Sequence, residues 1–197
     1  GEFSMPPKMI ERFQIVEYHR SFLSGRVSWG ITNSMLIVSG AFGVFKKQPV
    51  IEAGGYKTNT IGEDMEIVVR LHRLMKNQRR KYKIIFCEDA VCWTQGPMSV
   101  KDIRGQRRRW QIGLLDTLIS HASMFLNPFY GFVGLFAIPY NWIFELLGAI
   151  VEVLGYFIIP FSLLMGELNM FFFICYFLLA VLLGIILSLG SLILEQY

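Results

Sequence analysis

The sequence has 197 residues, of which 53% are hydrophobic and 17% are charged, and its formal net charge is +4. All 19 Lys and Arg residues lie at or before Arg109, together with 10 acidic residues, whereas five acidic residues and no basic residue follow. This asymmetry excludes a uniformly soluble chain and predicts a basic soluble domain followed by an apolar membrane part.

The cysteines Cys87, Cys92 and Cys175 show no C-x-x-C spacing. We therefore expect reduced, structural thiols and neither a disulfide framework nor a metal site. The start of the chain runs from Met5 into a charged segment and lacks an apolar core, so we expect no signal peptide.

The first predicted element is a helix over residues 8–24, which Gly25 would end. It would either pack on the domain or lie at a membrane surface, and the sequence favours neither. Residues 34–45 contain a buried-strand pattern at 35–38, after which Gly40 and Gly43 flank Phe42. Glycines there permit a tight turn, or else the close approach of a ligand.

Two further helices are predicted at residues 48–53 and 63–77, with a polar loop between them. The acids Glu63, Asp64 and Glu66 fill the first turn of the second helix, where they complement the helix dipole. Asp64 and Glu66 do not share a helix face, so they are not expected to form a metal pair. His72 lies in a basic, polar stretch and is expected to be solvated.

Strands are predicted at residues 83–87 and 90–94, around a Glu88-Asp89 turn. Ser99 is then expected to cap a long helix, with Asp102 three residues on, and the Asn127-Pro128 pair would end that helix.

That helix carries Gln106, Arg109, Trp110 and Gly113 on one face, because these positions follow i, i+3, i+4 and i+7 spacing. An amide, a guanidinium and an indole together suit a polar anion beside a sugar ring, since Arg can bind phosphate oxygens bidentately. The alternative is a basic juxtamembrane cluster that is attracted to anionic lipid headgroups.

The apolar end of the chain contains two candidate membrane spans, at residues 143–164 and 170–192. Residues 129–138 would lie in the membrane interface or enter the membrane, and the run 139–142 would interrupt the helix with interfacial aromatic residues. Glu145 and Glu152 share a helix face, and they would either face protein or a cavity, or Glu145 would sit at headgroup level with only Glu152 buried. The positive-inside rule places the basic part in the cytoplasm.

Three pieces occur in order: Ser39-Gly40-Ala41-Phe42-Gly43, then Gly62-Glu63-Asp64 opening a helix, then Gln106-x-x-Arg109-Trp110 ahead of membrane helices. Together they resemble the family-2 membrane glycosyltransferases, which include cellulose, hyaluronan and poly-N-acetylglucosamine synthases. The resemblance implies an α/β fold, the carboxy-terminal part of a GT-A-like nucleotide-sugar transferase domain, followed by transmembrane α-helices. One departure is Gly62, where several family members have Thr.

By the same resemblance, Asp64 would be the general base that takes the proton from the acceptor hydroxyl. Gln106 and Arg109 would hold the donor diphosphate. The acceptor would be bound by Trp110, Gly40, Ala41, Phe42, Gly43 and Glu63. The hydroxyl would then attack the anomeric carbon in one displacement, with inversion.

The resemblance divides the chain into an acceptor-side cytosolic part at 1–126 and a membrane region at 127–197. The donor-binding half, with its metal-binding Asp-x-Asp, has no match here, so we expect the fragment alone to be inactive and the intact enzyme to use Mg or Mn. Expected partners are a nucleotide-sugar donor, a glycan or lipid-linked acceptor and membrane lipids, with an export subunit left open and no nucleic acid. The location would be the cell membrane, multi-pass, with a cytoplasmic catalytic part.

UDP-N-acetylglucosamine is the expected donor, with UDP-glucose next. Two alternatives stay open. One is the non-processive transfer of one sugar to a lipid. The other is a non-enzymatic membrane hairpin whose basic domain binds lipids or a partner.

Overall fold

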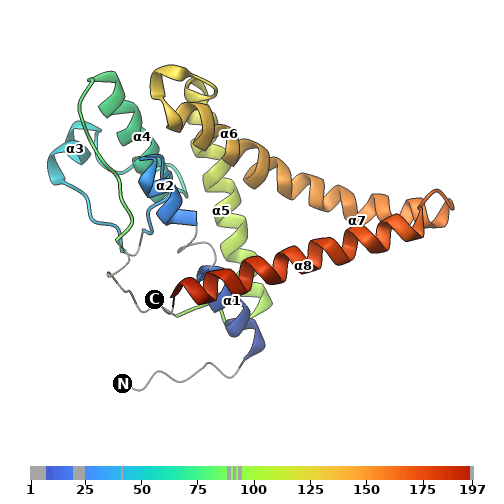
Figure 1. The fold of residues 1–197 in the computed structure, drawn as a ribbon. Helices are drawn as coiled ribbons and strands as arrows, with labels where there is room; N and C mark the ends of the chain where they lie inside the picture. Colours follow the sequence, from blue (N-terminus) through green and yellow to red (C-terminus); the bar gives the residue numbers. More distant parts are fainter. Residues whose placement is uncertain are drawn as a thin grey trace.

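The computed structural model describes residues 8–19, 25–40, 42–87, 90, 92 and 95–195. Figure 1 shows a folded part from which two long apolar helices extend as a hairpin. The helices of the folded part are α1 (Met9–His19), α2 (Val27–Ile31), α3 (Lys47–Glu52), α4 (Glu63–Asn77) and α5 (Val100–Ser120).

Helices α3, α4 and α5 confirm the sequence-based predictions. Helix α4 has the predicted bounds, and all its side chains from Met65 to Val69 are buried. Helix α5 begins after Ser99, whose hydroxyl accepts a hydrogen bond from the Asp102 backbone amide at 3.2 Å. It ends at Ser120, before the predicted Asn127-Pro128 stop, and 3₁₀ turns follow at Ala122–Met124 and Pro128–Tyr130.

No strand forms among the described residues, so the α/β expectation is not confirmed. Residues 35–38 and 83–87 are extended but do not join a sheet. The Asn33 side chain bonds the second segment instead, donating to the Tyr82 carbonyl at 3.0 Å and accepting from the Ile84 amide at 2.8 Å. Of the expected strand at 90–94 only residues 90 and 92 are described, and the expected Glu88-Asp89 turn lies outside the described residues.

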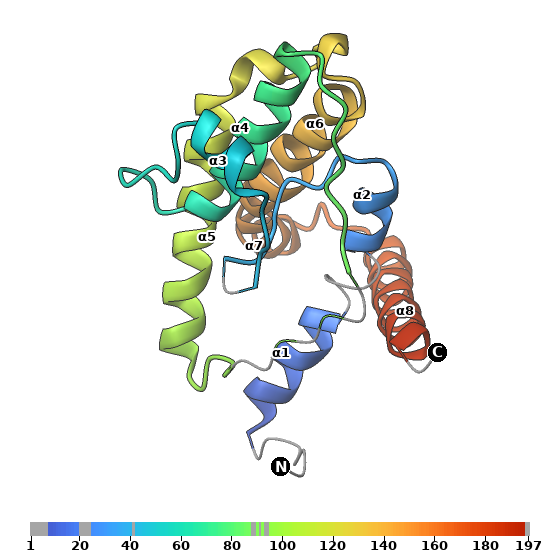
Figure 2. The same ribbon diagram turned by 90° about the vertical axis from the view of Figure 1, so that its left-hand side faces the viewer.

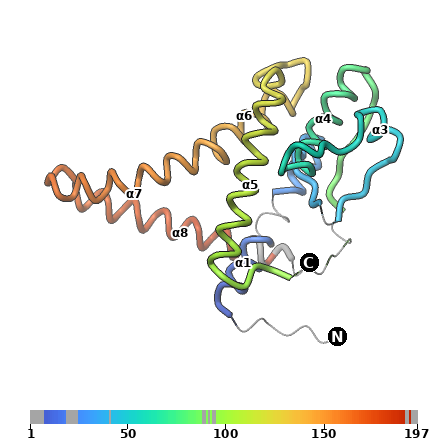
Figure 3. The backbone as a smooth tube through the Cα atoms, turned by 180° about the vertical axis from the view of Figure 1, so that it is seen from behind, coloured from blue at the N-terminus to red at the C-terminus, as the bar shows by residue number. Residues whose placement is uncertain are grey.

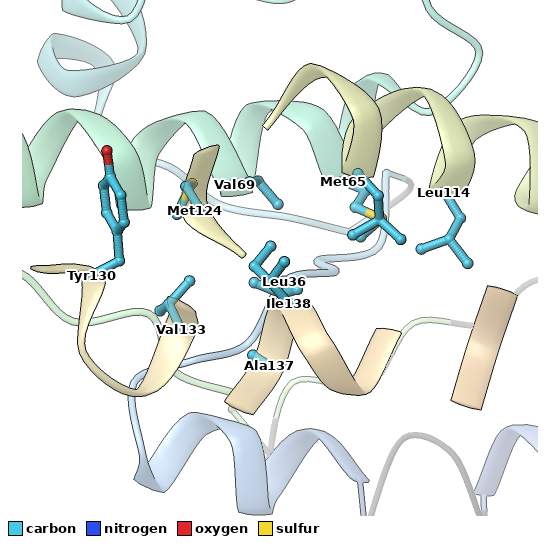
Figure 4. Close-up of a cluster of buried hydrophobic side chains, with 10 residues drawn as sticks. Leu36, Met65, Val69, Leu114, Met124, Tyr130, Val133, Ala137 and Ile138 are labelled. Carbon is cyan, nitrogen blue, oxygen red and sulfur yellow. The ribbon is translucent and has the colours of Figure 1, made fainter. Parts of the chain in front are cut away.

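The main core joins the extended segment 34–38 to helices α4 and α5 and to the turns that follow α5 (Figure 4). Its buried members are Leu36, Met65, Val69, Leu114, Leu118, Met124, Tyr130, Val133, Ala137 and Ile138. Residues 130–138 therefore contribute to the folded core, and residues 133–138 also begin the first apolar run, so the expectation that 129–138 lies in the interface or enters the membrane stays a prediction. The division of the chain at residue 126 remains a prediction.

After the core, helical turns continue from Val133 without the interruption predicted at 139–142. A π-helical segment (Val133–Ala137), α6 (Ile138–Tyr140) and a second π-helical segment (Asn141–Leu147) lead into α7 (Gly148–Leu164). Pro139 lies in the first turn of α6, where a missing amide hydrogen costs least.

Helix α8 (Met170–Glu195) runs back from the turn after α7 and diverges from α7 toward α1, as the view from behind shows (Figure 3). The runs Val133–Leu164 and Met170–Gly190 are both long and apolar enough to cross a membrane. Glu152 is exposed on α7 and accepts a hydrogen bond from the Tyr156 hydroxyl at 2.7 Å.

Candidate acceptor site

A hollow of about 210 Å³ lies where the segment after residue 38 meets the first turn of α4. Its walls are formed by Val38, Ser39, Gly40, Gly43, Phe45, Tyr56, Glu63 and Asp64. The structure thus brings together two of the three motifs, the first of which ends at Gly43 and the second of which begins at Gly62. Ala41 lies outside the described residues, and Phe42 is exposed and does not line the hollow.

Asp64 presents its carboxylate to this hollow from the amino terminus of α4. One oxygen, Oδ1, accepts a hydrogen bond from the Met65 amide at 2.8 Å. The other, Oδ2, lies 3.4 Å from the place where a side chain on Gly40 would begin. The absence of a side chain on Gly40 leaves the carboxylate open to the hollow.

Arg26, just before α2, adds positive charge near Asp64. Burial lowers the pKa of the Arg26 guanidinium, and the negative charge of Asp64 opposes part of that shift. Arg26 is thus a cation close enough to Asp64 to interact with it electrostatically.

Gly43 closes the turn that borders the hollow. A Cβ atom at this position would lie 2.8 Å from Val38 Cγ1 and 3.1 Å from the Ser39 carbonyl oxygen. The Phe42 amide donates to that same carbonyl at 3.1 Å. The glycine is therefore required by a tight turn, the first of the two alternatives that the sequence left open.

Helix α5 crosses the start of α4 where Gly113 packs directly against the backbone of Gly62. A Cβ atom on Gly113 would lie 2.7 Å from Gly62 Cα, and one on Gly62 would meet Gly113 at the same distance. The crossing explains why this chain needs glycine at position 62. It also fixes the third motif relative to Asp64, since Arg109 precedes Gly113 by about 6 Å of helix rise.

The third motif lies beside the hollow rather than in its wall. Arg109 is exposed, and Trp110 is 47% exposed. Gln106 donates to the Tyr18 hydroxyl at 3.2 Å, and its buried Oε1 has no partner among the described residues. Side chains thus link α1 to the start of α5, and α1 also contacts the candidate span α8 (Figure 2), so both alternatives for residues 8–24 stay open.

Arg107 is not part of that motif but anchors the same region. Its guanidinium forms an ion pair with Glu17 and lies 4.7 Å from the centre of the Trp110 ring. It is therefore engaged within the protein, whereas Arg109 is exposed and its Nη1 lies 3.9 Å from the place where a side chain on Gly105 would begin.

The prediction that His72 is solvated is wrong. Its side chain is 0% exposed, and Nε2 lies 2.9 Å from the Met35 carbonyl oxygen. The carbonyl requires Nε2 to donate, so Nδ1 accepts from the Tyr82 hydroxyl at 2.7 Å. Burial lowers the pKa of His72 to about 4, and the neutral imidazole joins both extended segments to α4.

Glu66 also does more than end-stabilise α4. It is 1% exposed, and its carboxylate contacts Lys57 at 2.9 Å, Arg70 at 2.8 Å and His121 at 3.3 Å. Burial alone would raise its pKa, but these three partners outweigh burial and hold the pKa below its ordinary value. The Glu66/Arg70 spacing of i, i+4 was the available sequence signal for this cluster.

Cys87, Cys92 and Cys175 are free thiols, and all three are exposed. In the described ranges, no three side chains of His, Cys, Asp or Glu converge in a way that could hold a metal ion. These residues therefore do not fit a metal centre, and no step of the chemistry below is assigned to one.

The profile of the glycosyl transferase family group 2 matches residues 6–189. Poly-beta-1,6-N-acetyl-D-glucosamine synthase of Staphylococcus aureus (strain COL) is 28% identical over 111 residues, which are 56% of this chain and 26% of the relative. A probable glucomannan 4-beta-mannosyltransferase 15 of Arabidopsis thaliana is 29% identical over 105 residues, which are 53% of this chain and 18% of the relative.

The matches thus span about a quarter or less of the length of these relatives. No solved structure matches the chain. Since the family profile covers nearly the whole sequence, the chain belongs to the glycosyl transferase family group 2.

Proposed function

We propose that the protein containing this chain is a membrane-bound inverting glycosyltransferase that extends a polysaccharide from a nucleotide-sugar donor. This chain would supply the acceptor side of the active site. The observation that carries the proposal is the meeting of the Asp64 carboxylate with Gly40 and Gly43 around an open hollow of about 210 Å³.

In the proposed reaction, an acceptor hydroxyl enters the hollow and donates a hydrogen bond to Asp64. As the hydroxyl oxygen attacks the anomeric carbon, its proton passes to the Asp64 carboxylate, and the bond from that carbon to the nucleotide diphosphate breaks. The leaving electron pair goes to the diphosphate oxygen, and configuration inverts in this single displacement. Glu63 on the same wall helps to position the loop.

Arg109 and Gln106 would stabilise the departing diphosphate. Arg109 is exposed about one helical turn from the crossing that fixes α5 against Asp64. A guanidinium at a developing negative charge is among the largest contributions that a side chain makes to such a transfer. Trp110, one residue on, would extend the acceptor surface.

UDP-N-acetylglucosamine is the proposed donor, with UDP-glucose second, because a relative is named for N-acetylglucosamine polymer synthesis. A divalent metal would act with the donor, through residues outside the set described above. The two candidate spans would anchor the protein in the cell membrane as a multi-pass protein, with the basic part in the cytoplasm.

A second candidate is the transfer of a single sugar to a lipid acceptor. An apolar hollow of about 310 Å³ lies between α2 and the start of the first candidate span, lined mainly by aromatic side chains such as Trp29, Phe136 and Tyr140. A lipid tail would fit such a surface. Product length separates the two candidates, since only the first yields a polymer.

The test compares Asp64→Asn with Asp116→Asn in the full-length protein in native membranes. Both changes remove one carboxylate, but Asp116 is exposed on α5 and does not line the hollow. We expect Asp64→Asn to reduce sugar incorporation at least about 100-fold, as loss of a general base does, and Asp116→Asn to retain it. Sugar incorporation that survives Asp64→Asn as well as it survives Asp116→Asn would refute the proposed role of Asp64, and no incorporation by the unaltered protein would favour the non-enzymatic alternative.

A further inference from the structure

Tyr56 is an aromatic residue of the hollow that the three motifs do not contain. It is 50% exposed, and it lines the same cavity as Gly40 and Asp64. Its ring packs edge-to-face against Phe45, with centroids 6.5 Å apart and planes at 89°. An exposed aromatic ring beside a carboxylate matches a sugar ring, which has an apolar C–H surface and hydroxyl groups at its edge.

The backbone on both sides of Tyr56 is held by buried charge. The preceding residue, Gly55, has its carbonyl bonded by an Arg70 guanidinium nitrogen at 2.7 Å. The following residue, Lys57, has its ammonium 2.9 Å from Glu66. Arg70 also bonds the Ala53 carbonyl, so this loop is fixed at three successive points around Tyr56.

Glycines allow the loop to take this path. Gly54 and Gly55 have φ angles of +88° and +73°, a region that side chains rarely adopt. Their amides donate to carbonyls of α3, and the second of these bonds, from Gly55 to Val50, measures 2.8 Å. Hydrogen bonds to α3 thus close the turn on one side, and Arg70 and Glu66 of α4 bind the loop on the other side.

The first turn of α4 connects this cluster to the proposed base. Asp64 and Glu66 are two residues apart, which places them about 200° apart around the helix axis. Asp64 therefore faces the hollow while Glu66 faces the interior, where its side chain is 1% exposed. The first turn of α4 thus places the Asp64 carboxylate on one wall of the hollow. Glu66 in the same turn contacts Lys57 and Arg70, and through them it positions the loop that carries Tyr56 on another wall.

We propose that Tyr56 is a further acceptor-binding residue that stacks on the sugar whose hydroxyl reacts. In this proposal Glu66, Arg70 and Lys57 are positioning residues that act through the Tyr56 loop. The inference rests on the proposed function and names the part of the site that selects a sugar ring over other hydroxyl compounds.

The first test measures initial rates with the full-length protein in native membranes, using β-1,6-linked N-acetylglucosamine oligosaccharides as acceptor probes. Tyr56→Ala should raise the acceptor KM about tenfold and leave kcat within about twofold. This pattern is expected when the lost contact binds the acceptor equally well in the ground state and in the transition state. Tyr56→Phe keeps the ring and should stay near the unaltered protein. Ile51→Ala is the matched control, since Ile51 is similarly exposed on α3 but does not line the hollow.

The second test addresses the positioning residues by a double-mutant cycle. Lys57→Met is chosen because Lys57 is 38% exposed, so the change disturbs folding less than one at Glu66. We expect it to raise the acceptor KM about threefold alone and to add little to Tyr56→Ala, since both act on one contact. A merely structural role would instead lower protein yield and add its full effect to that of Tyr56→Ala.

The outcomes separate this inference from the function on which it rests. If the unaltered protein transfers sugar and Tyr56→Ala matches Ile51→Ala, Tyr56 does not bind the acceptor and the inference is overturned alone. If the unaltered protein transfers no sugar, or Asp64→Asn has no effect, the proposed function is overturned and the inference with it. A KM effect confined to Tyr56→Ala and Lys57→Met supports both.

Discussion

Replacing Gly113 by Ala tests whether the glycine crossing positions the two halves of the site. The added Cβ would lie 2.7 Å from Gly62 Cα and 3.0 Å from the Gly62 nitrogen. Carbon atoms in contact prefer about 3.5–4.0 Å, so α5 would have to move away from α4 by about 1 Å. No flexible side chain can absorb this displacement, because both obstructing atoms belong to the backbone.

The expected cost follows from a comparison within the same helix. Overpacking of this kind costs about 1–3 kcal/mol, while Ala in place of Gly inside a helix gains about 1 kcal/mol. Gly105→Ala shares that gain, and the nearest atom to its Cβ is Arg109 Nη1 at 3.9 Å. The difference between the two variants therefore isolates the crossing, at about 1–3 kcal/mol.

The assay is thermal unfolding of the full-length protein in detergent. The melting temperature should therefore be lower for Gly113→Ala than for Gly105→Ala. Sugar transfer should fall with it, because the shift moves Arg109 relative to Asp64. If Gly113→Ala melts at or above the temperature of Gly105→Ala, the backbones do not touch as described and the reasoning fails.

Two further predictions concern His72 and Arg109. Burial lowers the pKa of His72 from 6.5 to about 4, so it contributes stability above pH 6.5 that is lost as the pH falls toward 4, on the order of 3 kcal/mol in total. In His72→Gln, the melting temperature should fall less than in the unaltered protein as the pH is lowered from about 7 to about 4.5. An equal fall in the two proteins would contradict a buried, neutral His72. Arg109→Met should lower kcat about 100-fold at an unchanged melting temperature, because Arg109 is exposed. Arg107→Met, the matched control, should lower the melting temperature with a smaller rate effect, and equal rate losses would argue against a diphosphate role for Arg109 alone.

Local signals predicted the helices well. The apolar stripe and acidic first turn gave α4 its bounds, and Ser99 with Asp102 located the start of α5. The extended segments were mistaken for strands because β-type patterning does not specify a partner. Here the Asn33 and His72 side chains take up backbone groups that a neighbouring strand would otherwise bind.

The site was predictable only where a motif marks it. Asp64, Gly40 and Gly43 were assigned to one place, and the structure brings them together. His72 was misjudged because a polar residue in a basic stretch looks solvated unless its distant partners are known, and the buried contacts of Glu66 were missed for the same reason. Those partners lie up to 55 residues away, beyond the reach of any local pattern.

The central claim is that this chain supplies the acceptor side of a sugar-transferring active site with Asp64 as the base. The most direct measurement is nucleotide release by membranes containing the full-length protein, offered UDP-N-acetylglucosamine and UDP-glucose separately. The account predicts release with one of the two donors, in step with sugar incorporation, and its loss in Asp64→Asn but not in Asp116→Asn. Release with neither donor from a folded protein, or release that survives Asp64→Asn, would contradict it.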